Sequence, residues 1–239
     1  MINNIGKFKI KIFADGADKK SILLLAKKSW VKGFTTNPTL MRKAGITNYQ
    51  AFAKEILAKI KIKPISFEVF SDDFSEMERQ AKLIASWGKN VYIKIPITNT
   101  KGKSSSALIK KLSKEGIKLN ITAIFTLLQI KHILPALSKK TPVIISVFAG
   151  RIADTGKDPM PLMKTAKKLL KKYPKAELLW ASPRELLNIF QAEKTGCDII
   201  TVQPDILAKS ALIGKNLKTF SLETVKMFYE DAKSVGYKL

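Results

Sequence analysis

Short runs of apolar residues alternate with longer amphipathic stretches from one end of the chain to the other. The short runs have the length and the β-branched character of strands, and the stretches between them repeat apolar positions with the period of a helix. The predicted strands are eight: Phe8–Ala14, Val31–Thr35, Ile65–Phe70, Val91–Ile95, Leu119–Ile124, Val143–Phe148, Glu177–Ala181 and Asp198–Val202. The predicted helices are nine: Lys19–Lys28, Tyr49–Lys61, Ser75–Trp87, Ser105–Lys114, Thr126–Leu137, Leu162–Tyr173, Pro183–Lys194, Pro204–Ile213 and Ser221–Val235.

This alternation predicts an α/β fold, and the number of strands predicts its closure. Strands joined by helices of this length run parallel, and eight such units make a (β/α)8 barrel, the TIM barrel. The 239 residues agree with the roughly 250 that are typical of one such barrel. We therefore expect a single domain over residues 1–239, with 221–235 as a C-terminal helix. The alternative is an open doubly wound sheet, which the strand count and the absence of a Gly-x-Gly-x-x-Gly turn disfavour.

The charge is the one unusual feature of the composition. Lysine and arginine number 43 against 19 acidic residues, a formal charge of +24, which invites a nucleic-acid interpretation. However, the lysines occur in pairs spread along the chain, without a run of five and without interleaved aromatic residues. Around Lys167-Lys168 and Lys171-Lys172, apolar residues at 163, 166, 169, 170 and 173 share one helical face. We therefore expect solvated helix faces rather than a specific nucleic-acid site.

Cysteine and histidine counts limit the chemistry. Cys197 is the only cysteine and His132 the only histidine, which excludes a disulfide framework and a multi-cysteine zinc site and disfavours a histidine-rich metal centre. The longest apolar stretch, Val143 to Ala149, is too short to cross a membrane, and the first residues lack the apolar segment of a signal peptide. We expect a cytoplasmic protein without metal or cofactor whose chemistry relies on Lys, Asp, Glu, Ser and Arg.

Polar residues gather where the predicted strands end, which is where a barrel of this kind builds its site. They are Asp15, Thr35-Thr36-Asn37, Glu68, Lys94, Asn120, Thr122, Ser146, Arg151, Ser182, Arg184 and Gln203. Arg151 and Arg184 follow the sixth and seventh strands, and their planar forks match a phosphate group. Two surface arginines are the alternative for that pair.

Lys94 is the most informative of these residues, because it lies in the middle of an apolar strand, Val91–Ile95, where an ammonium group is costly unless it is paired. One interpretation is a lysine that balances a buried acid, such as Glu68. The other is a desolvated nucleophile that forms a Schiff base with a carbonyl group. Asp15 precedes Gly16 at the end of the first strand, where it acts either as a turn-forming residue or as an acid–base group. The strands alone leave these alternatives open.

The chain resembles the transaldolases, a family of class I aldolase-type (β/α)8 barrels that includes the small fructose-6-phosphate aldolases. The segments that carry the resemblance occur in order along the whole chain: Gly33-Phe34-Thr35-Thr36-Asn37-Pro38-Thr39-Leu40, Tyr92-Ile93-Lys94-Ile95-Pro96, Asn120-Ile121-Thr122-Ala123-Ile124-Phe125, Ser146-Val147-Phe148-Ala149-Gly150-Arg151-Ile152-Ala153-Asp154 and Ala181-Ser182-Pro183-Arg184. The resemblance implies Schiff-base transfer of a dihydroxyacetone unit from a ketose phosphate to an aldose phosphate, in the pentose phosphate pathway. It also implies sugar-phosphate partners and a homo-oligomer, with Ser221–Val235 as a candidate interface.

The resemblance assigns roles to individual residues. Lys94 matches the Schiff-base lysine, and Asp15 matches the aspartate that moves protons at the substrate hydroxyl. Glu68 and Thr122 match the pair that holds a catalytic water. The positions that match substrate contacts are Asn37 and Ser146 for the sugar, and Arg151, Ser182 and Arg184 for the phosphate.

Two positions bear on which branch of the family the chain follows. The aldolase branch has tyrosine at the position of Phe148 and glutamine at that of Glu68, so the resemblance implies transferase activity here. Gly16 and Pro183 depart from the residues common in the family, and Pro183 puts the role of Arg184 in question. Aldolase-type cleavage is the alternative within the family. A basic barrel that binds polyanions without catalysis is the alternative from another class.

Overall fold

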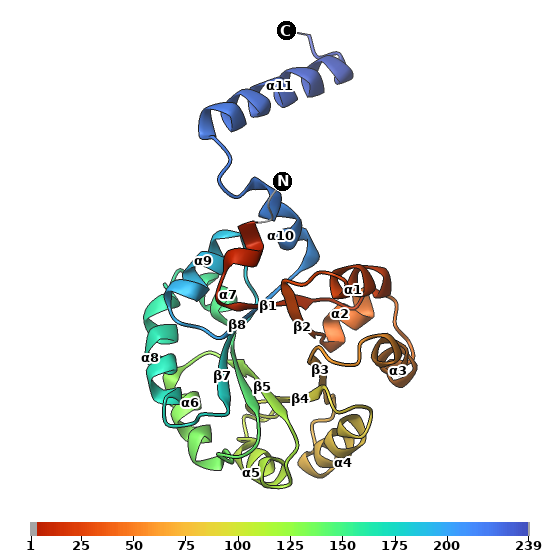
Figure 1. The fold of residues 1–239 in the computed structure, drawn as a ribbon, viewed down its shortest axis with the longest axis vertical. Coiled ribbons are helices and arrows are strands. Elements are labelled where there is room, and N and C mark those ends of the chain that lie inside the picture. The colour runs from red at the N-terminus through yellow and green to blue at the C-terminus, as the bar shows by residue number, and fades with distance from the viewer. Residues whose placement is uncertain (1–3, 239) are drawn as a thin grey trace.

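The computed structural model describes residues 4–238, and its centre is a closed barrel of eight parallel strands in sequential order (Figure 1). The strands are β1 (Lys11–Asp15), β2 (Val31–Thr35), β3 (Ile65–Glu68), β4 (Val91–Pro96), β5 (Leu119–Ile124), β6 (Val143–Val147), β7 (Ala176–Trp180) and β8 (Ile199–Val202). Pairing of β8 with β1 closes the cylinder. The predicted (β/α)8 barrel is confirmed, and the open sheet is not the fold.

Helices surround the barrel on its outer side. They are α1 (Lys19–Ala26), α2 (Pro38–Lys43), α3 (Tyr49–Lys59), α4 (Phe74–Ala85), α5 (Ser106–Lys114), α6 (Leu127–Ile133), α7 (Ala149–Ala153), α8 (Met160–Leu170), α9 (Leu187–Lys194) and α10 (Pro204–Ala208). A last helix, α11 (Leu217–Val235), follows them in the sequence. The chain also forms three short 3₁₀ helices: η1 (Asn4–Lys7) before β1, η2 (Leu134–Ala136) after α6 and η3 (Lys209–Leu212) after α10. On α8, Met163, Ala166 and Leu170 are buried, while Lys168 and the neighbouring Lys171 and Lys172 are exposed, as the sequence predicts. Lys167 differs, because it is half-buried and forms an ion pair with Asp198.

The boundaries of some elements differ from the predicted ones. The first strand begins at Lys11 rather than Phe8, because the ring of Phe8 packs edge-to-face on Phe190 below the barrel. Helix α9 begins at Leu187 rather than at the predicted Pro183, because Asn188 Oδ1 accepts the backbone N–H of Arg184 and so shapes a loop. Two short helices, α2 and α7, are absent from the prediction, since five or six residues are too few to show a helical period.

The core has two parts, one outside and one inside the barrel. Outward residues of the strands pack against the helices as one continuous apolar cluster. Inside, Phe13, Ile144, Leu179, Ala181 and Ile199 form a separate apolar cluster, of which Leu179 and Ala181 border the cavity described below. Gly33 makes room for the Phe13 ring, because a Cβ at position 33 would lie 2.5 Å from its Cζ. Above this apolar layer the inward residues become polar, so the upper half of the barrel holds the site.

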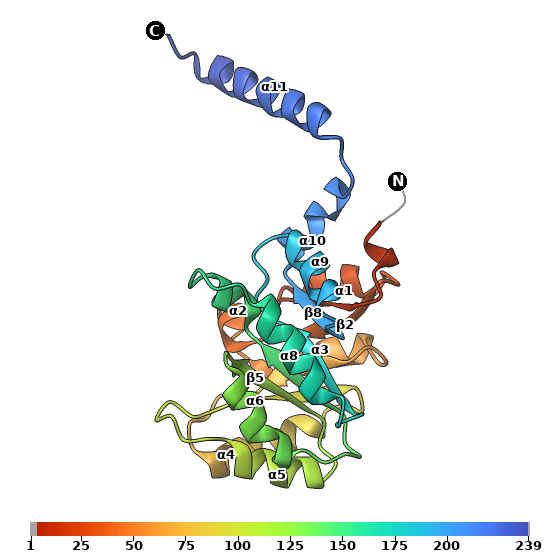
Figure 2. The same ribbon diagram turned by 90° about the vertical axis from the view of Figure 1, so that its left-hand side faces the viewer.

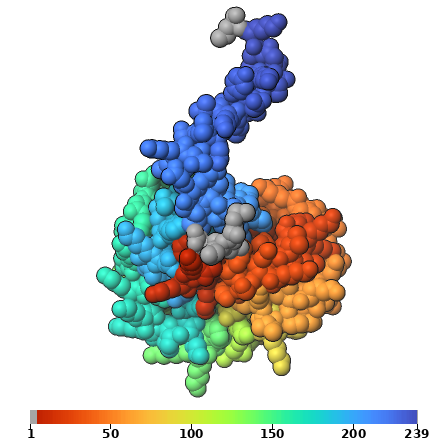
Figure 3. All heavy atoms as spheres, turned by 45° about the horizontal axis from the view of Figure 1, so that its top comes forward, coloured from red at the N-terminus to blue at the C-terminus, as the bar shows by residue number. Residues whose placement is uncertain are grey.

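The last helix, α11, lies apart from the barrel. It projects away from the strands and helices in two perpendicular views (Figures 1 and 2), and the space-filling view shows the same arrangement (Figure 3). None of its residues is buried. It starts at Leu217, four residues before the predicted Ser221, because Asn216 caps it by accepting the N–H of Thr219. No helix among residues 4–238 has the length and apolarity to cross a membrane.

Candidate active site

The ten site residues predicted from the sequence line one cavity at the carboxyl ends of the strands. Its volume is about 470 Å³. They come from seven strands or the segments that follow them: Asp15, Asn37, Glu68, Lys94, Thr122, Ser146, Phe148, Arg151, Ser182 and Arg184. All strands of a parallel barrel present these ends to the same rim, so residues more than 160 positions apart meet there.

Lys94 lies at the bottom of this cavity and is only 7% exposed. Its Nζ donates a hydrogen bond to the Thr36 carbonyl oxygen at 2.8 Å and lies 2.9 Å from Glu68 Oε2. Strand register explains this pair, because Glu68 on β3 stands directly opposite Lys94 on β4. The lysine is therefore paired with an acid, the half-buried Glu68, in line with one interpretation of the sequence, and it also lines the cavity.

Glu68 is held in place through its backbone. The Tyr49 hydroxyl, which comes from α3, donates to the Glu68 carbonyl at 2.9 Å and accepts the Glu68 N–H at 2.8 Å. Burial raises the pKa of Tyr49 well above its usual range, so the phenol stays protonated and can serve as this donor. The last residue of β3 is thereby fixed, which keeps its carboxylate beside Lys94.

Asp15, the last residue of β1, is half-buried on the same wall. Its Oδ1 accepts a hydrogen bond of 2.7 Å from the Thr35 hydroxyl. Burial raises the pKa of Asp15, and the positive charge of Lys94 and the Thr35 hydroxyl oppose that rise. An aspartate with a raised pKa beside a lysine is suited to accept and return a proton.

A chain of buried amide and hydroxyl groups crosses the far wall. Ser146 donates to Asn120 Oδ1 at 2.6 Å, and Asn120 Nδ2 donates to Ser66 Oγ at 3.0 Å. Thr122, one pleat above Asn120 on β5, has a buried hydroxyl that makes no hydrogen bond with any described residue. That hydroxyl borders the cavity and can bind a polar ligand atom or a water molecule.

The two arginines stand at the rim on the side of β6 and β7. Arg151 follows Phe148 on α7, and its guanidinium lies 5.3 Å from the Phe148 ring centroid, a cation–π contact. Arg184 forms a two-pronged ion pair with Asp154, with Nε 2.9 Å from Oδ1. This pair lowers the pKa of Asp154 and keeps its carboxylate ionised. Both arginines are exposed, which leaves them accessible to a ligand from solution.

The segments that carry these arginines touch each other through their backbones. Gly150 N–H donates to the Ala181 carbonyl oxygen at 3.2 Å, and a Cβ at position 150 would lie 1.5 Å from the Ser182 carbonyl oxygen. Ser182 itself has a left-handed backbone, with φ of 57°, as does Ala123 on the opposite wall. Non-glycine residues in this conformation are uncommon and cluster at binding sites.

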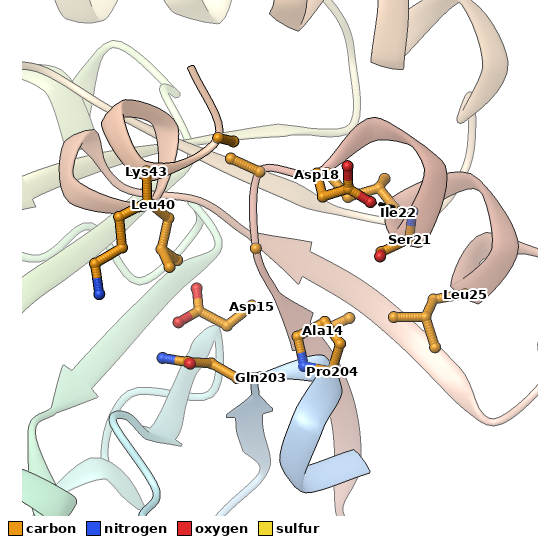
Figure 4. A pocket seen from close by; sticks show the side chains of 13 residues that line it. Ala14, Asp15, Asp18, Ser21, Ile22, Leu25, Leu40, Lys43, Gln203 and Pro204 are labelled. Atoms are coloured by element: carbon orange, nitrogen blue, oxygen red, sulfur yellow. Dashed lines mark hydrogen bonds between the residues drawn. The ribbon is translucent and has the colours of Figure 1, made fainter. Parts of the chain in front are cut away.

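A second, mostly apolar cavity of about 250 Å³ adjoins the first on the side of α1, α2 and α10 (Figure 4). The two cavities share Asp15, Leu40, Lys43 and Gln203. Asn37 lies nearby at the start of α2, where its Oδ1 caps the helix by accepting the Leu40 N–H at 3.0 Å. The amide NH₂ of Asn37 is not used by this cap and can donate to a ligand.

Several cavity residues receive no role from the sequence. Asn120 and Gln203, which the sequence places among the polar residues at strand ends, line the cavity from β5 and from the residue after β8. Thr201 lines it from β8, and Thr39 and Lys43 line it from α2. The strand residues could be found from the sequence, since each is separated by two positions from another inward residue. The α2 residues carry no such signal, because that helix is too short to be recognised.

Metal-ligand side chains do not gather at this site or elsewhere in residues 4–238, where no three His, Cys, Asp or Glu side chains are placed to share an ion. His132 is exposed on α6. Cys197 is buried, and burial raises its pKa to about 12, so its thiol is not a nucleophile at neutral pH.

Comparison with known proteins agrees with this geometry. The family model described as transaldolase/fructose-6-phosphate aldolase matches residues 12–239. The chain belongs to this family. It is therefore an enzyme of the aldolase and transaldolase type.

Curated relatives match over nearly the full chain. A probable transaldolase of Nitrosopumilus maritimus is 35% identical, and the match covers 94% of this chain and 97% of the relative. One from Thermoplasma volcanium is 36% identical over 95% and 97%. One from Dehalococcoides mccartyi is 37% identical over 83% and 88%.

Solved structures share the barrel at low identity. The putative phosphonomutase of Burkholderia cenocepacia has a TM-score of 0.56 at 10% identity, covering 94% of this chain and 97% of that one. KGPDC from Streptococcus mutans has a TM-score of 0.54 at 10% identity, covering 81% and 88%. These similarities concern the fold alone.

Proposed function

We propose that this protein is a transaldolase of the pentose phosphate pathway. It transfers a dihydroxyacetone unit from a ketose phosphate, fructose 6-phosphate or sedoheptulose 7-phosphate, to an aldose phosphate through a Schiff base on Lys94. The observation that carries this proposal is the buried contact of Lys94 with Glu68, in one cavity with Asp15 and below two arginines. Its partners are then sugar phosphates, and the chemistry needs no cofactor.

Imine formation uses Lys94 and Glu68. The ammonium of Lys94 first gives up a proton, for which the adjacent Glu68 carboxylate, at 2.9 Å, is the base. The neutral amine adds to the C2 carbonyl of the ketose, and the carbinolamine loses water to give a protonated imine. Thr122, whose hydroxyl has no partner among the described residues, and Glu68 would hold the water that leaves here and returns in hydrolysis.

Carbon–carbon cleavage uses Asp15. The protonated imine withdraws electrons, so the C3–C4 bond breaks when Asp15 removes the proton from the C4 hydroxyl. The bonding electrons pass into the imine to give an enamine, and the C4 fragment leaves as an aldehyde. In the reverse direction, the enamine carbon attacks the aldehyde of an acceptor, and Asp15 returns the proton to the new hydroxyl.

The substrate phosphate would bind at the rim, to Arg151, Ser182 and Arg184. Arginine forks bind phosphate oxygens in pairs, and the late loops are a frequent phosphate site in barrels. Arg184 must then exchange its ion pair with Asp154 for the phosphate or share it between the two. Asn37 and Ser146 would contact the hydroxyl groups of the bound sugar from opposite walls.

Transferase activity, rather than simple aldolase cleavage, follows from Phe148. Its ring borders the cavity and contacts Phe125 and Arg151. A phenylalanine has no hydroxyl that could protonate the enamine carbon. The three-carbon unit then stays on Lys94 until an aldose arrives. This step separates the proposal from the aldolase alternative within the same family.

Borohydride reduction tests the Schiff base. The enzyme is incubated with fructose 6-phosphate and sodium borohydride, and the modified peptide is identified by mass spectrometry. We expect a stable adduct on Lys94 in the wild type and none in Lys94→Ala. Lys43→Ala is the matched control, because Lys43 lines the same cavity and should leave the adduct unchanged. An adduct that persists in Lys94→Ala refutes the proposal.

The acceptor requirement tests the transfer step. With fructose 6-phosphate alone, we expect one equivalent of glyceraldehyde 3-phosphate per active site and no accumulation of free dihydroxyacetone. Adding erythrose 4-phosphate should start continuous turnover. Repeated release of dihydroxyacetone without an acceptor would instead identify an aldolase.

We also propose that copies of the chain associate through α11. Its exposed apolar residues cover most of the helix surface: Leu217, Phe220, Leu222, Val225, Met227, Phe228, Tyr229 and Val235. Helix α11 carries three lysines and three acids, so it is neutral on a chain of charge +24, and two copies that meet there bring no excess of like charge together. An apolar face of this size normally packs against a partner.

Light scattering coupled to size-exclusion chromatography tests the association. The wild type should elute as an oligomer, and Phe228→Asp should reduce its mass. Lys226→Asp, on the polar side of the same helix, is the control and should not. A monomeric wild type would contradict this proposal.

A further inference from the structure

Two threonines that lie far apart in the sequence meet beside Asp15. Thr35 ends β2 and Thr201 lies in β8, and these strands flank β1 on its two sides. Both threonines are buried, with 3% and 5% exposure. Their hydroxyl oxygens are 2.5 Å apart, and Thr35 Oγ1 is 2.7 Å from Asp15 Oδ1. The three side chains therefore form a continuous chain of hydrogen bonds.

The number of hydroxyl protons determines which group donates in each of these two hydrogen bonds. A threonine hydroxyl has one proton to donate, and an ionised carboxylate can only accept. Thr35 must give its proton to Asp15, so the Thr35 oxygen is left as an acceptor toward Thr201. Thr201 must then be the donor in the second hydrogen bond. The order is Thr201 to Thr35 to Asp15, and Thr201 itself makes no contact with the carboxylate.

We propose that Thr201 acts through Thr35 as a positioning residue that holds the Asp15 carboxylate in the orientation needed for proton transfer. This inference rests on the proposed function, in which Asp15 takes the proton of the C4 hydroxyl. Oδ1 is occupied by Thr35, whereas Oδ2 makes no hydrogen bond with any described residue. This hydrogen-bond relay, from Thr201 through Thr35 to Asp15, thus leaves the second carboxylate oxygen of Asp15 for the substrate.

The relay also affects the charge state of Asp15. Hydrogen bonds in a chain polarise one another, so a donor behind Thr35 makes Thr35 a stronger donor. Thr35 lowers the pKa of Asp15 against the effect of burial. The charged groups that face Asp15 are Lys94 from β4, Glu68 from β3 and Lys43 from α2. These remain when Thr201 is changed, so a shift in the acidic limb of the rate profile would report on the relay.

Substitutions at both threonines test the relay. Thr201→Val keeps the shape of the side chain and removes the donor. We expect kcat to fall about fivefold to tenfold, with little change in KM, and the acidic limb of kcat to move to higher pH. Thr201→Ser restores a hydroxyl and should recover most of the rate. In a Thr35→Val background, Thr201→Val should cause no further loss of kcat, because the Thr35 hydroxyl that links Thr201 to Asp15 is already absent.

Two outcomes would overturn the inference. One is an effect of Thr201→Val that is as large in the Thr35→Val background as in the wild type. The other is a normal rate and pH profile in folded Thr201→Val, or in Thr201→Ala if the valine variant does not fold. Borohydride trapping distinguishes these two outcomes from a failure of the proposed function. A wild type that forms no adduct refutes the Schiff base. If the wild type and every variant form the adduct and the variants have unchanged kinetics, only the relay is refuted.

Discussion

Replacing Gly150 with alanine should destabilise the protein and disrupt the phosphate side of the site. The added Cβ would lie 1.5 Å from the Ser182 carbonyl oxygen and 2.5 Å from its carbon, and both atoms belong to the backbone. Since Cβ contacts below 3.0 Å are essentially never observed, α7 and the loop after β7 must separate by at least about 1.5 Å. This movement breaks the 3.2 Å hydrogen bond from Gly150 N–H to Ala181.

The magnitude follows from three contributions. A buried donor left without a partner costs about 1 to 3 kcal/mol, and overpacking costs about 1 to 3 kcal/mol more. Alanine in a helix offsets about 1 kcal/mol of this sum. The free energy of unfolding should therefore fall by about 3 kcal/mol, which lowers Tm by roughly 6 to 12 °C in a chain of this size.

Urea denaturation followed by circular dichroism measures this change, and kinetics measure the effect on the site. Because Arg151 and Ser182 sit on the two displaced segments, kcat/KM for phosphorylated sugars should fall about tenfold to hundredfold. Borohydride trapping of dihydroxyacetone on Lys94 should survive, since β4 is not displaced. Gly6→Ala is the control, because its Cβ would meet Trp30 at an ordinary 3.8 Å. A Gly150→Ala variant within about 0.5 kcal/mol of the wild type would refute the steric reasoning.

Three further predictions concern the cavity. Arg151→Ala should raise KM for phosphorylated substrates about tenfold or more while kcat changes less, and an unchanged preference for phosphorylated over unphosphorylated sugars would show that the phosphate binds elsewhere. Phe148→Tyr should introduce a proton donor near the enamine and allow slow, repeated release of dihydroxyacetone from fructose 6-phosphate alone, which chromatography can follow. Asp15→Asn should abolish transfer yet raise Tm at pH 7. Burial raises the pKa of Asp15, so the folded protein binds its proton more tightly than the unfolded chain and the wild type loses stability as pH rises through that pKa. The Tm advantage of Asp15→Asn should accordingly shrink toward pH 4, and an advantage independent of pH would contradict this explanation.

The sequence alone determined the barrel and the composition of its site. Eight short apolar runs separated by amphipathic stretches allow few arrangements, because parallel strands need long crossovers and eight of them close. Closure then brings every strand end to one rim. For this reason the polar residues identified at the predicted strand ends, except Thr36, line a single cavity, to which the family resemblance adds Phe148. The pairing of Glu68 with Lys94 was equally accessible, since the two occupy adjacent strands and a charge in an apolar strand requires a partner.

Tertiary structure alone decided the contacts that pass between non-adjacent strands or between loops. Thr35 meets Thr201 across β1, Arg184 pairs with Asp154, and the backbone at Gly150 touches that at Ser182. Period-two alternation states which face of a strand a residue occupies, but it does not state the height of that residue relative to a strand two places away. That height depends on the stagger of all eight strands around the closed barrel, a property of the assembled cylinder rather than of any one segment.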